Sequence, residues 1–98
     1  MRITKTVDGD KLLLKVEERL DTTTAPELEE EIKNSIEGVK ELTLDFSGLD
    51  YISSAGLRVL LSAQKTMNKQ GKMVVTGVNS TVMEVFSVTG FSEILNIE

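Results

Sequence analysis

Residues 42–61 read LTLDFSGLDYISSAGLRVLL, and this stretch decides how the chain folds. Its first residues alternate Leu42 and Leu44 with polar side chains, which is typical of a β-strand with one buried face. A polar segment over residues 47–52 follows, and its glycine and aspartate are common in loops. Small residues then open a run with leucines at helical spacing, which predicts a helix over about residues 54–70.

The residues before this stretch predict a β-hairpin followed by a helix. Apolar and polar residues alternate over 3–7, and Asp8-Gly9 is a dipeptide favoured in tight hairpin turns. The apolar run over 12–16 predicts a second, more deeply buried strand. Thr24 and Glu27 have the spacing of a helix capping box, and an apolar stripe of helical period follows them.

The residues after this stretch predict a strand over 73–75, a short helix and a last strand over 94–97. The complete order is therefore β-β-α-β-α-β-α-β, with no linker or repeat to divide it. Helices that alternate with strands require parallel strand pairs joined by right-handed crossovers. We therefore expect an α/β fold: one domain over residues 1–98, with a mixed, mostly parallel sheet and an N-terminal β-hairpin.

The composition argues against several functions. The 98 residues contain no cysteine and no histidine, so the chain has no thiolate nucleophile, imidazole base or ordinary zinc site. The net charge of −5 argues against nucleic acid and anionic membranes as partners, because both attract clustered lysine and arginine. We expect a binding protein that is not an enzyme, with no cofactor and no bound metal.

The sequence also bears on location and assembly. It has no apolar run long enough to span a bilayer, and its first five residues lack the apolar stretch of a signal peptide. The absence of cysteine agrees with a reducing compartment. We therefore expect a cytoplasmic protein, and its modest apolar surface predicts a monomer when it is free.

Ser54 stands where such a fold places functional groups. Ligand and partner sites of open α/β sheets lie beyond the carboxyl ends of the parallel strands, and the loop before Ser54 is at that edge. Free N–H groups at a helix N-terminus favour an anion there, and Ala55-Gly56 leave room for another protein. Two structural interpretations compete. A serine before a helix is commonly an N-cap, and Gly56 allows close packing of the helix on the sheet.

Three segments carry a resemblance that goes beyond this pattern: LDTTTA at residues 20–25, LDFS at 44–47 and SSAGL at 53–57. Together, over residues 3–98, they resemble the STAS domain of bacterial anti-sigma factor antagonists. That family has a Leu-Asp-x-x-Thr/Asn-Ala segment, a strand ending in Asp-x-Ser, and a loop of the form Asp-Ser-Ser/Thr-Gly-Leu at the start of the second helix. The three segments match these motifs in the same order.

The resemblance implies that Ser54 is the phosphorylation site. The family's acidic residue before the acceptor is replaced by Ser53, so Ser53 is the second choice for the acceptor. Glu18-Arg19 stands where many relatives have Gly-Glu, so a different turn is expected there. The residues expected to bind a partner are Asp21, Thr22, Asp45, Ser53, Ser54, Ala55, Gly56 and Arg58.

The aspartates have two interpretations each. Asp21 either contacts the partner or ends the second strand ahead of the helix. Asp45 and Asp50 are expected to add negative charge around the loop, and the alternative for Asp50 is a turn hydrogen bond.

The resemblance also implies the partners. The unmodified protein would bind an anti-sigma factor that is also a serine kinase, and so free a sigma factor. The kinase would phosphorylate Ser54, and a PP2C-type phosphatase would reverse the change. One alternative is a STAS subunit of another signalling or lipid-transport assembly. Another is a small-ligand or nucleotide-binding module at the same helix N-terminus, which the lack of a glycine-rich phosphate loop disfavours.

Overall fold

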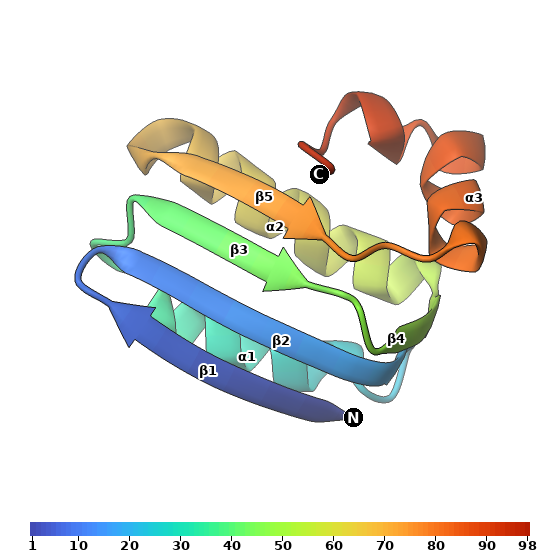
Figure 1. The fold of residues 1–98 in the computed structure, drawn as a ribbon, viewed down its shortest axis with the longest axis horizontal. Coiled ribbons are helices and arrows are strands. Elements are labelled where there is room, and N and C mark those ends of the chain that lie inside the picture. Colours follow the sequence, from blue (N-terminus) through green and yellow to red (C-terminus); the bar gives the residue numbers. More distant parts are fainter.

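A computed structural model describes the whole chain, residues 1–98, as a five-stranded sheet with helices against one face (Figure 1). The opposite face of the sheet carries no helix, and a third helix lies at one end of the strands (Figure 1). The elements in chain order are β1 (Arg2–Asp8), β2 (Lys11–Leu20), α1 (Ala25–Ser35), β3 (Glu41–Asp45), β4 (Leu49–Ile52), α2 (Ser54–Gln70), β5 (Lys72–Thr76), α3 (Ser80–Thr89) and a 3-10 turn, η1 (Phe91–Glu93).

The sheet joins one antiparallel hairpin to a set of parallel strands. β1 pairs antiparallel with β2, so that Asp8 lies opposite Lys11 across the hairpin turn. β2 pairs in parallel with β3, and β3 in parallel with β5. α1 and α2 carry the chain back between these parallel strands, as crossover connections require. The predicted α/β fold class, with its mixed sheet and N-terminal hairpin, is confirmed.

The segment predicted as a loop contains a short strand, β4. It pairs in parallel with the last residues of β2, with Arg19 opposite Tyr51 and Leu20 opposite Ile52. The loop prediction was wrong here because β2 pairs with β3 only as far as Lys15 and then extends beyond it, leaving a free edge. Burial of Ile52 at 1% exposure holds the short strand on that edge.

The predicted last strand over residues 94–97 is reduced to one β-bridge, between Ile97 and Val75. Its apolar residues suggested a strand, but the N–H groups of Ile94 and Leu95 donate to the Phe91 carbonyl at 3.0 and 2.9 Å. A backbone bonded within this turn is not free to pair with a neighbouring strand. The observed order is therefore β-β-α-β-β-α-β-α, followed by η1.

The hydrophobic core lies between the sheet and helices α1 and α2. α2 contributes Leu57, Leu60, Ala63 and Met67, all buried, whereas Leu61, which was expected on the same face, is half-buried. Each fully buried leucine stabilises the fold by roughly 1.5–3 kcal/mol relative to an exposed one. The inward residues of the central strands, at most 2% exposed, are Leu12, Leu14, Val16, Leu42, Leu44, Met73 and Val75.

The core packing gathers three elements at one end of the sheet. β4, the beginning of α2 and α3 all lie where β2, β3 and β5 finish (Figure 1). Asn79 links two of them, because its side-chain N–H donates to the Leu49 carbonyl at 2.9 Å and its oxygen accepts the Val82 N–H that begins α3. This is the edge at which the sequence placed the functional loop.

Glu18 is the only residue other than glycine with a left-handed backbone, at φ 79°. It lies at the irregularity where the pairing of β2 with β4 shifts register, and its N–H donates to the Gly48 carbonyl at 2.8 Å. A residue with a Cβ adopts this conformation at a cost of about 1–2 kcal/mol, whereas glycine adopts it freely. Strain is therefore concentrated where β2 turns toward β4.

Replacing Glu18 by glycine is expected to give a more stable protein than replacing it by alanine. Both variants lose the glutamate side chain, but only alanine keeps a Cβ in the left-handed conformation. The free energy of unfolding should differ by about 0.5–1 kcal/mol after allowing for the greater freedom of glycine in the unfolded chain. Urea unfolding followed by circular dichroism measures this difference, and equal stabilities would contradict the strain at Glu18.

Candidate functional site

Ser54 is the first residue of α2, and Ser53 occupies the cap position before it. Ser53 has an extended backbone, and its carbonyl accepts the Leu57 N–H at 3.0 Å. Ser54 is exposed, and its hydroxyl has no hydrogen-bond partner in the structure. The interpretation of Ser54 as the helix cap is therefore wrong, and its hydroxyl is open to another molecule.

The neighbouring hydroxyl of Ser53 is in a different environment. Its oxygen is buried and has no hydrogen-bond partner, so it does not cap the helix with its side chain either. The Ser53 backbone is held, because its N–H donates to the Leu20 carbonyl at 2.9 Å. The structure thus separates two adjacent serines that the sequence left as alternatives, one with an exposed hydroxyl and one with an enclosed hydroxyl.

Gly56 is buried and explains how the start of α2 reaches the sheet. A Cβ at this position would lie 2.7 Å from Leu20 Cγ and 2.8 Å from Ile52 Cγ1. Contacts this short do not occur between ordinary side chains, so the helix would have to move. The packing interpretation of Gly56 is correct, and the room expected there for another protein is filled by Leu20 and Ile52.

A shallow hollow of about 290 Å³ lies beside Ser54, between the beginnings of α1 and α2. It brings together three residues of the expected partner surface, Thr22, Ala55 and Arg58. Arg58 is exposed and forms no salt bridge. Ala25, Pro26, Glu29 and Val59 complete the lining.

Asp21 organises the turn between β2 and α1. Its carboxylate accepts the Thr23 hydroxyl at 2.8 Å and the N–H groups of Thr23 and Thr24 at 3.0 and 3.2 Å. These hydrogen bonds, that from the Thr23 hydroxyl above all, lower the pKa of Asp21 to about 2. The capping box predicted for Thr24 and Glu27 does not form, because the Thr24 hydroxyl accepts the Asp21 N–H and donates to the Arg19 carbonyl. The structural role of Asp21 is confirmed, and its contact with a partner stays a prediction.

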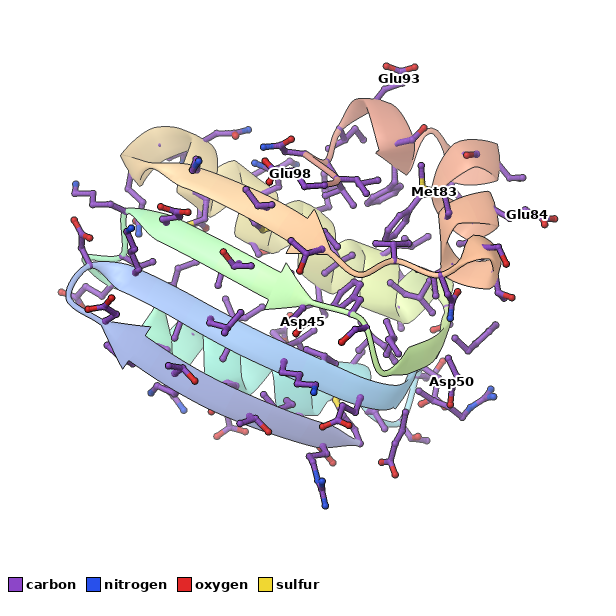
Figure 2. The ribbon with its side chains drawn as sticks, in the orientation of Figure 1. Asp45, Asp50, Met83, Glu84, Glu93 and Glu98 are labelled. Atoms are coloured by element: carbon purple, nitrogen blue, oxygen red, sulfur yellow. The ribbon has the colours of Figure 1, made fainter.

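Asp45 and Asp50 lie on different strands, at the end of β3 and on β4 (Figure 2). Asp45 accepts the Ser47 N–H at 2.9 Å, and this bond, followed by the Ser47 side chain and the charge of Lys15, lowers the pKa of Asp45. The turn hydrogen bond considered for Asp50 is therefore made by Asp45. The Asp50 side chain is exposed and accepts no hydrogen bond.

Arg19 and Tyr51 form a surface pair that the sequence reasoning missed. The Arg19 guanidinium carbon lies 4.6 Å from the centre of the Tyr51 ring, and its Nε donates to Asp21 at 3.5 Å. The tyrosine remains 37% exposed. Arginine and tyrosine are the residue types that most often anchor protein interfaces. No local pattern signals this contact, because it depends on the unpredicted pairing of β2 with β4.

The structure holds no group of three or more acidic side chains placed to bind a metal ion. None of its helices has the length and apolar character needed to cross a bilayer.

The sequence profile of the STAS domain matches residues 2–98. The chain is 38% identical over 80 residues to BtrV of Bordetella bronchiseptica, named as a candidate anti-sigma factor antagonist; the match covers 80% of this chain and 69% of BtrV. It is 31% identical over 94 residues to the anti-sigma-B factor antagonist of Listeria monocytogenes, covering 93% of this chain and 82% of that protein.

Solved structures show the same fold. A protein of Thermotoga maritima described as a candidate anti-sigma factor antagonist has a TM-score of 0.89 at 20% identity, covering 97% of this chain and 84% of that one. The Bacillus cell-fate determinant SpoIIAA matches in its unphosphorylated form with a TM-score of 0.78 at 15% identity, covering 99% and 87%. Its phosphorylated form matches with a TM-score of 0.77 at 16% identity, covering 99% of this chain and 91% of that one. At these identities the likeness establishes the fold alone.

Gly56→Ala is expected to lower the free energy of unfolding by about 1–3 kcal/mol, because the added methyl group overpacks the contact with Leu20 and Ile52. Ser62→Ala on the exposed side of α2 is the control and should change stability by no more than about 0.5 kcal/mol. Chemical unfolding of both variants gives the comparison. A Gly56→Ala protein as stable as the Ser62→Ala control would refute the close packing described here.

Asp21→Asn is expected to remove an acid-sensitive part of the stability. The folded-state pKa of Asp21, about 2, lies below its ordinary 3.8, so folding favours the ionised carboxylate. Its contribution is complete above about pH 4 and is lost as the pH falls toward 2. Urea titrations between pH 4 and pH 2 should therefore show a steeper loss in the unmodified protein than in Asp21→Asn.

Asp50→Asn is the control for this titration, because the Asp50 carboxylate accepts no hydrogen bond. It should follow the unmodified protein across the same pH range. Identical slopes for all three proteins would mean that the bonds to Asp21 contribute nothing to stability.

Proposed function

The chain belongs to the STAS domain family, and on that basis we propose that it is an anti-sigma factor antagonist controlled by phosphorylation of Ser54. The unmodified protein binds an anti-sigma factor that is also a serine kinase, and this binding frees a sigma factor. Two kinds of support are independent of each other. Relatives of 38% and 31% identity are named as anti-sigma factor antagonists, and the Ser54 hydroxyl is exposed and unbonded at the first residue of α2.

The exposure of Ser54 is the observation that carries the proposal. A kinase must bring the γ-phosphate of ATP to the serine oxygen in line with the leaving group. The Ser54 side chain can be approached from solvent, whereas the Ser53 oxygen is buried. The enclosed hydroxyl of Ser53 therefore makes it a poor substrate, although it stands in the adjacent position.

The chemistry of the modification comes from the kinase. The Ser54 oxygen attacks the γ-phosphorus of ATP, the new O–P bond forms as the bond to ADP breaks, and the hydroxyl proton passes to a base of the kinase. This chain contributes the acceptor and the surface that the kinase binds.

The added charge separates the modified protein from its partner. A phosphoserine adds about −1.5 to −2 charges, which takes the net charge from −5 to roughly −7. The phosphate is tolerated by the fold because it lies at the start of α2, where N–H groups point outward. A partner that packed against a neutral serine then meets a negative charge. A loss of about 3 kcal/mol weakens association on the order of a hundredfold.

The partner surface is centred on the hollow between α1 and α2. Thr22, Ala55 and Arg58 line it, and Ser54 stands at its edge. Asp21 and Asp45 shape the surface because they hold the turns beside it. Ser53 and Gly56 contribute the backbone at the start of α2. Arg19 and Tyr51 extend it on the side of β4.

The proposal also includes how the phosphate is removed and where in the cell the exchange takes place. A PP2C-type phosphatase removes the phosphate, and the exchange takes place in the cytoplasm, where the kinase has ATP. The free protein is a monomer that exchanges partners, with no catalytic role.

The test is phosphorylation of the purified protein by the serine-kinase anti-sigma factor encoded nearest to its gene. Mass spectrometry should locate one phosphate on Ser54, lost in Ser54→Ala and retained in Ser53→Ala. Calorimetry should then show on the order of a hundredfold weaker binding of the phosphorylated protein to the kinase, and undiminished binding by Ser54→Ala.

Phosphate on Ser53, or unchanged affinity after modification of Ser54, would overturn the proposed switch. Binding without any phosphorylation would favour a STAS subunit of another signalling or lipid-transport assembly. Saturable nucleotide binding by the isolated chain would favour a ligand-binding module.

A further inference from the structure

Arg58 places a cation one helical turn after Ser54. Residues four apart on an α-helix lie on the same face, with about 5–6 Å between their Cβ atoms. Long side chains in helices lean toward the N-terminus and cover the turn before their own Cα. The guanidinium of Arg58 is therefore within reach of a group attached to the Ser54 oxygen.

The Arg58 guanidinium is not paired with any other group in the structure. Arg58 is exposed and forms neither a salt bridge nor a side-chain hydrogen bond. Glu29 of α1 lines the same hollow, yet the two side chains do not pair. Arg19, another cation at this end of the molecule, is already paired with Asp21. A phosphate of about −1.5 to −2 charges would attract Arg58 more strongly than the single charge of Glu29.

We propose that Arg58 binds the phosphoryl group of phosphorylated Ser54 within the same molecule. This proposal rests on the proposed modification of Ser54. It adds which side chain responds to the phosphate. Arginine presents a planar fork of N–H donors that matches two phosphate oxygens. The N–H groups of the first turn of α2, which have no partner within the helix, face the same phosphate.

The consequence is a switch that changes two groups at once. With Ser54 unmodified, Arg58 extends over the hollow and is available to an acidic group of the partner. With Ser54 phosphorylated, the guanidinium turns to the phosphate and the hollow loses its cation. The pair of phosphate and guanidinium keeps a net charge of about −0.5 to −1. The partner therefore meets a negative site where it had met the positive charge of Arg58, while Glu29 remains.

The test uses protein with phosphoserine encoded directly at position 54, so that no kinase is needed. Phosphorus NMR titration reports the second pKa of the phosphate, ordinarily about 6. Arg58 stabilises the doubly charged form, so Arg58→Gln should raise this pKa by about half a pH unit. Lys65→Gln makes the same charge change two turns further along α2, where the side chain is also exposed, and should leave the pKa where it is in the parent protein.

A second measurement follows the arginine itself. In nitrogen-proton NMR spectra, the Arg58 Nε–H signal should shift and exchange more slowly in the phosphorylated protein than in the unmodified one. The same phosphate pKa in Arg58→Gln and Lys65→Gln, with an unchanged Nε–H signal, would sink the proposal. That result would leave the proposed function intact if a kinase still modifies Ser54. Conversely, a kinase that never modifies Ser54 would end the proposed function without altering the titration.

Discussion

The close approach of α2 to the ends of β2 and β4 is the constraint on which the rest of this end of the molecule depends. Position 56 has no space for a Cβ, because Leu20 and Ile52 already fill it. Both of those side chains are at most 1% exposed, so they are part of the core and cannot yield to the helix. The first turn of α2 is consequently held in one place, and Ser54 with it. A serine held this way has a fixed position, and its exposed hydroxyl faces solvent.

β2 has to be unusually long for this packing to exist. Its first half pairs with β3 and its last residues pair with β4, and the shift between them falls at Glu18, with its left-handed backbone. Strain at that point is the cost of bringing Leu20 under the start of α2. Local backbone strain persists where the surrounding structure holds it, and here the surrounding structure is the hydrophobic contact of Leu20 and Ile52 with Gly56.

The polar groups of the site divide into those used for structure and those left for partners. The carboxylates of Asp21 and Asp45 both accept hydrogen bonds from backbone N–H groups of the turns that follow them. Such bonds favour the ionised carboxylate, which is why both pKa values are lowered. Ser54 and Arg58 remain without partners, and Arg19 is stacked on an exposed tyrosine. The two aspartates therefore hold the turns of this surface in place. The side chains without hydrogen-bond partners, Ser54 and Arg58, are those that another molecule can bind.

Periodicity determined most of the fold from the sequence alone. The hairpin, the two covering helices and the parallel strands follow from local alternation and helical spacing, as does the placement of Ser54 at the start of α2 beyond the strand ends. Tertiary structure decided what local patterns do not contain. The pairing that makes residues 49–52 a strand depends on a free edge of β2, far away in the sequence. Contacts between distant segments also decided which of two adjacent serine hydroxyls is enclosed, and that Arg19 meets Tyr51. Spacing along a chain fixes the direction of a side chain relative to its own element, but its exposure depends on what the other elements place against it.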